Sequence, residues 1–310
     1  MKATYHSSYR FFKPEQKPGT IVALSDVHFP GRVTADMHRA LMFAKEQSPN
    51  LIVIPGDLVD NLDAVSCETE RIALRRWLEK LGQIAPVCLC IGNHDFYYKK
   101  PNFRSGLAGY GYASRQPDDL LALVNSIPNV HFLDNEFYMD ARYCVYSLTL
   151  PPEYYDCELH PGSEDFKVFI DALKKVSYAF EKLPKRKTKI LLVHSPAFLK
   201  EKAIRKHLNN FDFILAGHMH NGVVPPLLHE IWRSHAGIAT PDKKFFRDHN
   251  CRLGLYDDQF ICLGAVTTVH KGSKPLGWAN SFFPTYVATI KVGHNSADAK
   301  KPDVKHKYER

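Results

Sequence analysis

The sequence predicts an α/β fold in which helices cover a sheet of parallel strands. In the first hundred residues, short apolar runs alternate with segments of helical periodicity. The apolar runs at 20–25, 51–54 and 86–91 are nearly continuous, which is typical of strands that are buried on both faces of a sheet. The resulting β-α-β-α-β order favours parallel strands joined by crossover helices.

The individual elements follow from spacing and boundary residues. A helix is expected at 33–47, where Met37, Leu41 and Ala44 share one face, and a second at 68–82. Further helices are expected to start near 117 and to span 163–183 and about 197–207. Further strands are expected at 129–138 and 142–150, as a candidate hairpin, and at 189–193, 211–215, 260–263 and 286–290.

The domain organisation is expected to be simple. We predict one domain over 1–292, followed by a disordered polar tail at 293–310. The aromatic, glycine-rich loop at 96–116 is too long for a mere connection. Together with segment 221–283, which is rich in aromatic and basic residues, this loop is expected to face the substrate.

Composition excludes several classes of protein. Hydrophobic residues make up 45% of the chain and charged residues 24%, as in ordinary globular domains. No apolar run approaches the roughly 20 residues that span a bilayer, and the first residues contain no apolar signal segment. The seven cysteines are scattered and odd in number, which indicates reduced thiols. We therefore expect a cytoplasmic protein.

The formal net charge of +8 favours anionic partners, which include phosphorylated substrates, nucleic acid and anionic membrane surfaces. Much of this charge lies in the tail and in Lys185-Arg186-Lys187, where solvated surface is the usual explanation. No long basic and aromatic stripe supports nucleic-acid binding, and no protein partner is evident. A peripheral membrane contact would rest only on Pro226-Leu227-Leu228 and Phe282-Phe283-Pro284.

Polar clusters follow five of the predicted strands. They are Ser25-Asp26-Val27-His28, Gly56-Asp57, Gly92-Asn93-His94-Asp95, Val193-His194 and Gly217-His218-Met219-His220. Ligands of α/β sheets bind beyond the carboxyl ends of the strands, so these clusters should converge in space. In Asp-x-His and His-x-His, alternate side chains would lie on the same side of an extended segment.

The donor types indicate a metal centre. Carboxylate, amide and imidazole groups without thiolates suit Mn²⁺, Fe or Zn²⁺. There are more donors than one ion needs, so two ions that share a carboxylate fit better. A single histidine near a strand end is more often a hydrogen-bonded structural residue, which is how we interpret His38, His131, His160 and His207. A structural role of this kind does not explain five polar clusters that each follow a predicted strand.

The ordered set resembles the calcineurin-like metallophosphoesterase superfamily, whose motifs are D-x-H, G-D-x-x-D/N, G-N-H-D/E, H and G-H-x-H. The resemblance covers residues about 20–222 and is loosely similar to the bacterial YkuE-like phosphoesterase group. It implies a four-layer α-β-β-α sandwich, in which two mixed sheets lie face to face with helices outside.

The resemblance also implies a role for each motif residue at a centre of two divalent or trivalent ions (Mn²⁺, Fe²⁺/Fe³⁺ or Zn²⁺). The implied ligands are Asp26, His28 and His220 for the first ion, Asn93, His194 and His218 for the second, and Asp57 as the bridge. His94 would protonate the leaving group, and Asp60 would orient and charge His94. We expect Gly92 to make the turn off its strand and Asp95 to brace the loop.

The implied activity is that of a metal-dependent hydrolase acting on phosphoric ester bonds. A metal-bridging hydroxide would attack phosphorus in line, in a small phosphomonoester or phosphodiester. One alternative is a pyrophosphate hydrolase of a nucleotide-sugar or nucleotide-lipid conjugate; a nuclease and a non-catalytic scaffold have less support. Asn61-Leu62 after Asp60 replaces the Arg-Gly of protein Ser/Thr phosphatases, which disfavours that activity.

Overall fold

The computed structural model of the chain describes residues 4–11, 13, 15–99, 112–151, 164–196, 202–218, 220, 254–256, 259–267, 285–293 and 303–309. The centre of the predicted loop at 96–116 and most of segment 221–283 lie outside these residues, and so does the start of the predicted helix at 197–207. Their expected contact with substrate stays a prediction.

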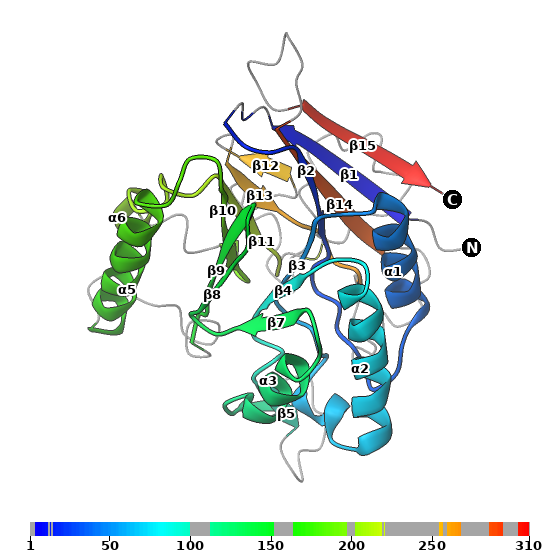
Figure 1. Ribbon diagram of the computed structural model, residues 1–310. Coiled ribbons are helices and arrows are strands. Elements are labelled where there is room, and N and C mark those ends of the chain that lie inside the picture. Colours follow the sequence, from blue (N-terminus) through cyan, green and yellow to red (C-terminus); the bar gives the residue numbers. More distant parts are fainter. Residues whose placement is uncertain are drawn as a thin grey trace, which may run out of the picture.

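Two mixed β-sheets form the centre of the molecule (Figure 1). Within the described ranges, the first sheet has seven strands, in the spatial order β15 (Asp303–Glu309), β1 (Thr4–Phe11), β14 (Thr285–Val292), β2 (Gly19–Ala23), β3 (Leu51–Pro55), β4 (Val87–Cys90) and β7 (Val130–Leu133). The second has six, in the order β12 (Gly254–Tyr256), β13 (Phe260–Cys262), β11 (Phe213–Ala216), β10 (Thr188–Val193), β9 (Tyr143–Leu148) and β8 (Phe137–Met139). Strands β5 (Tyr97–Lys99) and β6 (Tyr112–Ser114) form a separate ribbon.

Helices cover the outer face of each sheet (Figure 1). Those on the first sheet are α1 (Ala35–Gln47), the 3₁₀ turn η1 (Leu62–Val65), α2 (Glu68–Gly82) and α3 (Asp118–Asn125). Those on the second are α5 (Glu164–Glu181) and α6 (Lys202–Arg205). The four-layer α-β-β-α sandwich that the sequence resemblance implies is therefore confirmed.

Three apolar clusters fill the three interfaces between these layers. Met37 of α1 and Trp77 of α2 belong to the cluster under the first sheet, and the Trp77 Nε1–H donates to the Met37 carbonyl at 3.0 Å. Val53 and Leu192 belong to the cluster between the sheets. Phe180 of α5 belongs to the third, beneath the second sheet. Burial of this apolar surface is the main force that holds the layers together.

The strand directions bring many carboxyl ends to one edge. Strands β2, β3, β4 and β7 run parallel to one another, as do β9, β10, β11 and β13 in the second sheet. Among the described strands, antiparallel pairing occurs for β8 with β9 and β12 with β13 in the second sheet, and for β1 with β15 and β14 with β2 in the first. The polar clusters at the ends of the parallel strands can therefore meet.

The ends of the chain differ from the sequence prediction. The disorder expected at 293–310 is wrong for β15, which pairs antiparallel with β1 from Thr4↔Glu309 to Arg10↔Asp303. Strand β1 was itself not predicted. Strand β15 is polar, and as an edge strand it needs little apolar surface because its backbone hydrogen bonds hold it; lysines such as Lys305 also discourage further strand pairing. Strand β1 lies between β15 and β14 and alternates polar residues with the buried aromatic residues Tyr5, Tyr9 and Phe11.

The predicted hairpin at 129–138 and 142–150 also differs from the structure. Val130–Leu133 joins the first sheet beside β4, whereas Phe137–Met139 pairs antiparallel with β9 in the second. The predicted strand at 129–138 is therefore two strands, and the chain crosses between the sheets at 134–136. Among the helices that the structure describes, none combines the length and apolar character needed to span a membrane.

Deletion of residues 303–310 tests the contribution of β15. We expect the free energy of unfolding to fall by roughly 2–4 kcal/mol, because each lost backbone hydrogen bond contributes about 0.5–1.5 kcal/mol net. The exposed edge of β1 should also promote association. Urea titration and size-exclusion chromatography measure the two effects, and an unchanged urea midpoint would show that β15 does not stabilise the sheet.

Candidate metal centre

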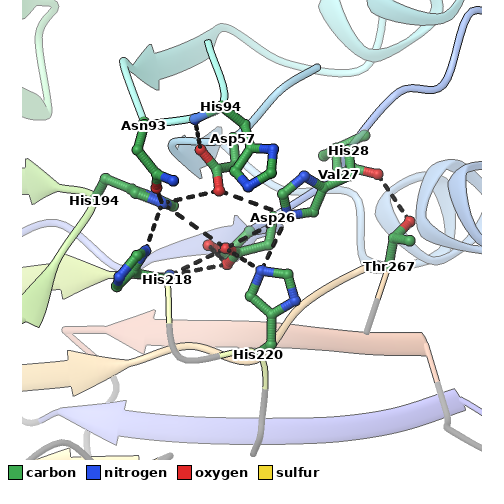
Figure 2. A network of polar contacts seen from close by, with 12 residues as sticks. Asp26, Val27, His28, Asp57, Asn93, His94, His194, His218, His220 and Thr267 are labelled. Carbon is green, nitrogen blue, oxygen red and sulfur yellow. Dashed lines mark hydrogen bonds and ion pairs between the residues drawn. The ribbon is translucent and has the colours of Figure 1, made fainter. Parts of the chain in front are cut away.

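Polar side chains from the ends of five parallel strands meet at one place (Figure 2). The strands come from both sheets: β2, β3 and β4 from the first, and β10 and β11 from the second. The side chains are those of Asp26, His28, Asp57, Asn93, His94, His194, His218 and His220. The structure thus brings together the seven predicted metal ligands and the predicted catalytic histidine.

A first group of donors consists of Asp26, His28, Asp57 and His220, all of them buried. One nitrogen or oxygen of each lies within 4.8 Å of those of the others. The two Nε2 atoms of His28 and His220 are 3.0 Å apart, and Asp26 Oδ1 is 3.1 Å from His220 Nε2. This is the set predicted for the first ion together with the bridge.

A second group consists of Asp57, His194 and His218, whose donor atoms also lie within 4.8 Å of one another. His194 Nε2 is 3.3 Å from His218 Nδ1 and 3.1 Å from Asn93 Oδ1. The same nitrogen is 3.1 Å from Asp57 Oδ2, which is itself 3.6 Å from His28 Nε2. A single carboxylate oxygen of Asp57 therefore faces both groups.

The donor set fits two metal ions. Two imidazole nitrogens that face each other can share at most one hydrogen, and buried polar atoms without partners are costly. Cations resolve this problem, since they accept lone pairs from several such atoms at once. Oxygen and imidazole donors without thiolate suit Mn²⁺, Fe or Zn²⁺. The buried cluster of histidines and aspartates is accordingly consistent with a dimetal centre.

Neighbouring groups form hydrogen bonds with the polar atoms of the donors that face away from the cluster, here called their outer atoms. His194 Nδ1 donates to the Pro55 carbonyl at 2.9 Å, which directs Nε2 toward the cluster. Asp26 Oδ2 accepts a hydrogen bond from the Ser25 hydroxyl at 2.6 Å, and Asp57 Oδ1 accepts one from the His94 amide at 2.9 Å. The supporting role of Ser25 was missed from the sequence, although a hydroxyl directly before a motif aspartate was a visible signal.

The backbone is left-handed at five of the seven predicted metal ligands. Asp26, His28, Asp57, His218 and His220 have φ angles of 50°, 47°, 53°, 70° and 49°. The expectation that Asp-x-His and His-x-His lie on extended segments is therefore wrong, because left-handed turns direct these side chains. Such conformations cost on the order of 1 kcal/mol for residues other than glycine, so surrounding contacts must maintain them.

Three motif glycines make room for the donors. A Cβ atom at Gly56 would collide with the His194 ring, one at Gly92 with Asp57, and one at Gly217 with Ser25 and Asp26. Gly56 also has a φ of 84°. Gly92 does not have positive φ, so the turn expected of it is not the reason for glycine there. Its function is to let β4 approach the Asp57 carboxylate.

Mutual attraction in the cluster favours the charged forms of its aspartates and histidines. Burial opposes ionisation of Asp57, but His194 and His94 outweigh it and hold the pKa of Asp57 well below its usual value. Burial alone would lower the pKa of His194, but Asp57 and Asp26 raise it to about 9. At neutral pH the Asp57 carboxylate is therefore ionised, and His194 carries a proton on Nε2 as well as on Nδ1. A cation that binds His194 must displace the proton on Nε2.

His94 lies beside the two groups and is only partly buried. Its Nδ1 is 2.7 Å from the backbone carbonyl of Asp60, and because a carbonyl only accepts, Nδ1 carries the hydrogen. The predicted orienting contact is therefore made by the backbone of Asp60. The Asp60 carboxylate lies within 4.8 Å of ring nitrogens of both His94 and His28.

Asp95 braces the loop, as predicted. It is fully buried, and its two oxygens accept hydrogen bonds from the Gly92 amide at 2.9 Å and the Val59 amide at 3.1 Å. These bonds tie the end of β4 to the segment that follows Asp57. Burial, followed by the nearby charge of Asp57, raises the pKa of Asp95 to about 7.

The variant Gly92→Ala tests the close packing. The added methyl group must displace Asp57, so we expect Mn²⁺ affinity to fall by roughly tenfold or more and the free energy of unfolding to fall by roughly 1–3 kcal/mol. Isothermal titration calorimetry and urea unfolding measure these two quantities. Affinity equal to that of the unmodified protein would contradict the proposed role of Gly92.

Comparisons with known proteins bear on the whole site. Residues 19–222 match the family model of the calcineurin-like phosphoesterases, a stretch that contains all five motifs. An uncharacterized metallophosphoesterase of Campylobacter jejuni is 24% identical over 212 residues, which are 67% of this chain and 46% of the relative. The chain thus spans about half the length of that curated relative.

Two solved structures are similar at low sequence identity. A dimetal phosphatase from Danio rerio aligns with a TM-score of 0.43 and 13% identity, covering 83% of this chain and 91% of its own. The phosphopantetheinyl hydrolase of Mycobacterium tuberculosis aligns with a TM-score of 0.39 and 13% identity, covering 84% and 94%. On the family match over residues 19–222, this chain belongs to the calcineurin-like phosphoesterase family.

Proposed function

We propose that this metal-dependent phosphoesterase hydrolyses a small phosphomonoester or phosphodiester at a centre of two ions. The observation that supports this most is the position of Asp57, whose Oδ2 faces both donor groups. A carboxylate in that position is suited to bridge two cations. Two cations are in turn suited to clamp the oxygens of a phosphoryl group during in-line displacement.

The proposed assignment of ligands follows the two donor groups. Asp26, His28 and His220 would hold one ion, Asn93, His194 and His218 the other, and Asp57 both. Bound cations would supply neutralisation of phosphoryl charge and a water of lowered pKa near neutrality. The protein contributes fixed positions, because the donors lie at the ends of buried strands and their outer atoms are hydrogen-bonded.

His94 is the proposed general acid. Its ring packs edge-on against His28, with centroids 4.7 Å apart, at the border of the first donor group. The Asp60 carbonyl fixes a hydrogen on Nδ1, so Nε2 is the atom that can hold and release a second proton. A leaving alkoxide needs such a proton, and general acids of this kind typically contribute 10²–10⁴-fold.

A comparison of leaving groups tests this role. With Mn²⁺ present, we expect His94→Ala to hydrolyse an alkyl phosphate roughly 10²–10⁴-fold more slowly than the unmodified protein. The loss should be much smaller for p-nitrophenyl phosphate, since p-nitrophenolate leaves without protonation. His38→Ala, at an exposed histidine of α1, is the control and should be unaffected. Equal losses on both substrates would contradict general-acid catalysis by His94.

A second variant tests the bridge. Asp57→Asn removes the charge but keeps the shape, so we expect metal-dependent hydrolysis of p-nitrophenyl phosphate and bis-p-nitrophenyl phosphate to be lost with weakened Mn²⁺ binding. The ratio of the two rates in the unmodified protein distinguishes a monoesterase from a diesterase. Activity of Asp57→Asn that persists with a chelator present would refute the proposed function. Analysis of products from a nucleotide-sugar would detect cleavage of a pyrophosphate instead.

A further inference from the structure

A short segment after β13 crosses from the second sheet to the first beside the metal centre. This crossing segment comprises residues 263–267. Its Leu263 amide donates to the Ala216 carbonyl of β11 at 2.7 Å, and its Val266 amide donates to the Ser25 carbonyl at 2.7 Å. Ala265 accepts a hydrogen bond from the Tyr286 amide of β14 at 3.1 Å. The segment therefore joins the backbone ahead of Gly217 to the backbone ahead of Asp26.

Thr267 ends the crossing segment at the Asp26–His28 turn (Figure 2). Its amide donates to the Asp26 carbonyl at 3.1 Å, and its hydroxyl donates to the Val27 carbonyl at 2.8 Å. On the other side of the turn, the His28 amide donates to the Asp57 carbonyl at 3.0 Å. The turn is thus held between Thr267 and the segment that carries the shared carboxylate.

The Val27 carbonyl lies at the point of the turn where the backbone conformation is least favourable. It lies between two left-handed residues, Asp26 and His28, whose conformation requires support from their surroundings. Val27 is fully buried, so its carbonyl oxygen needs a partner within the protein, and the Thr267 hydroxyl is such a partner. Loss of this bond should allow the peptide to rotate and should move the His28 ring.

We propose that Thr267 is a positioning residue for the first donor group, acting through the backbone of the Asp26–His28 turn. This inference rests on the proposed two-ion function. It extends the site beyond the family match, which ends at residue 222. It also gives the crossing segment a role in the site, since the Thr267 hydroxyl sets the geometry of the ligands Asp26 and His28.

The matched variants are Thr267→Val and Thr267→Ser. Valine has the shape of threonine but cannot donate to the Val27 carbonyl, whereas serine retains the hydroxyl. The control is Thr188→Val, which removes a buried threonine hydroxyl bonded to Gln16 Oε1 at 3.1 Å, at the opposite end of β10 from His194. This control separates a local effect on the donors from general destabilisation.

Isothermal titration calorimetry with Mn²⁺ measures the effect on the ions. We expect Thr267→Val to bind one of two Mn²⁺ ions roughly 10–100-fold more weakly, as when a group that orients a metal ligand is removed. Thr267→Ser should regain most of that affinity, and Thr188→Val should bind both ions as the unmodified protein does. Equal loss of affinity in Thr267→Val and Thr188→Val would overturn the inference.

Hydrogen exchange of the metal-free protein supplies a readout that does not depend on activity. We expect amides 27–29 to exchange at least tenfold faster in Thr267→Val, because the turn opens more often. Two Mn²⁺ ions bound normally by Thr267→Val, with unchanged exchange, would overturn this inference and leave the proposed function intact. An unmodified protein that binds no Mn²⁺ would overturn both.

Discussion

The Asp57 carboxylate is the group on which the arrangement of the site depends. It is buried at the end of β3, one of its oxygens faces donors from both sheets, and the other accepts the amide hydrogen of His94. A buried charge of this kind is stable only with close partners of opposite charge. The histidines supply these partners in the protein alone, and the proposed cations supply them when bound. The ends of β4, β10 and β11 carry groups that surround this carboxylate.

The packed sandwich holds the groups around Asp57 in place, although the local backbone conformations at several of them are unfavourable. Five donors have left-handed backbone, and three glycines allow contacts that no side chain would permit. These are unfavourable local choices, which the large apolar interfaces on either side of the two sheets must maintain. Hydrogen bonds that Asp95 accepts and that Thr267 donates then fix the loops between strand and donor. A precisely placed cluster on loops requires this kind of cross-connection.

Much of this could be predicted from the sequence, because strand ends in a parallel sheet have a fixed relation to one another. The apolar runs before Asp26, Asp57 and Asn93 locate the site, and the order of the motifs indicates the family and hence the four layers. Strand β15 is polar and β1 alternates aromatic with polar residues, so neither has such an apolar run and both were missed. Left-handed turns, the backbone contact from Asp60 and the approach of Thr267 depend on contacts between distant segments, which no local pattern encodes.

The proposed function depends on the sharing of Asp57 by two metal ions. Anomalous diffraction from crystals grown with Mn²⁺ would locate these ions. We expect two peaks per chain, one among Asp26, His28 and His220 and the other among Asn93, His194 and His218, with an oxygen of Asp57 in contact with both. A single peak, or two peaks of which only one touches Asp57, would contradict it.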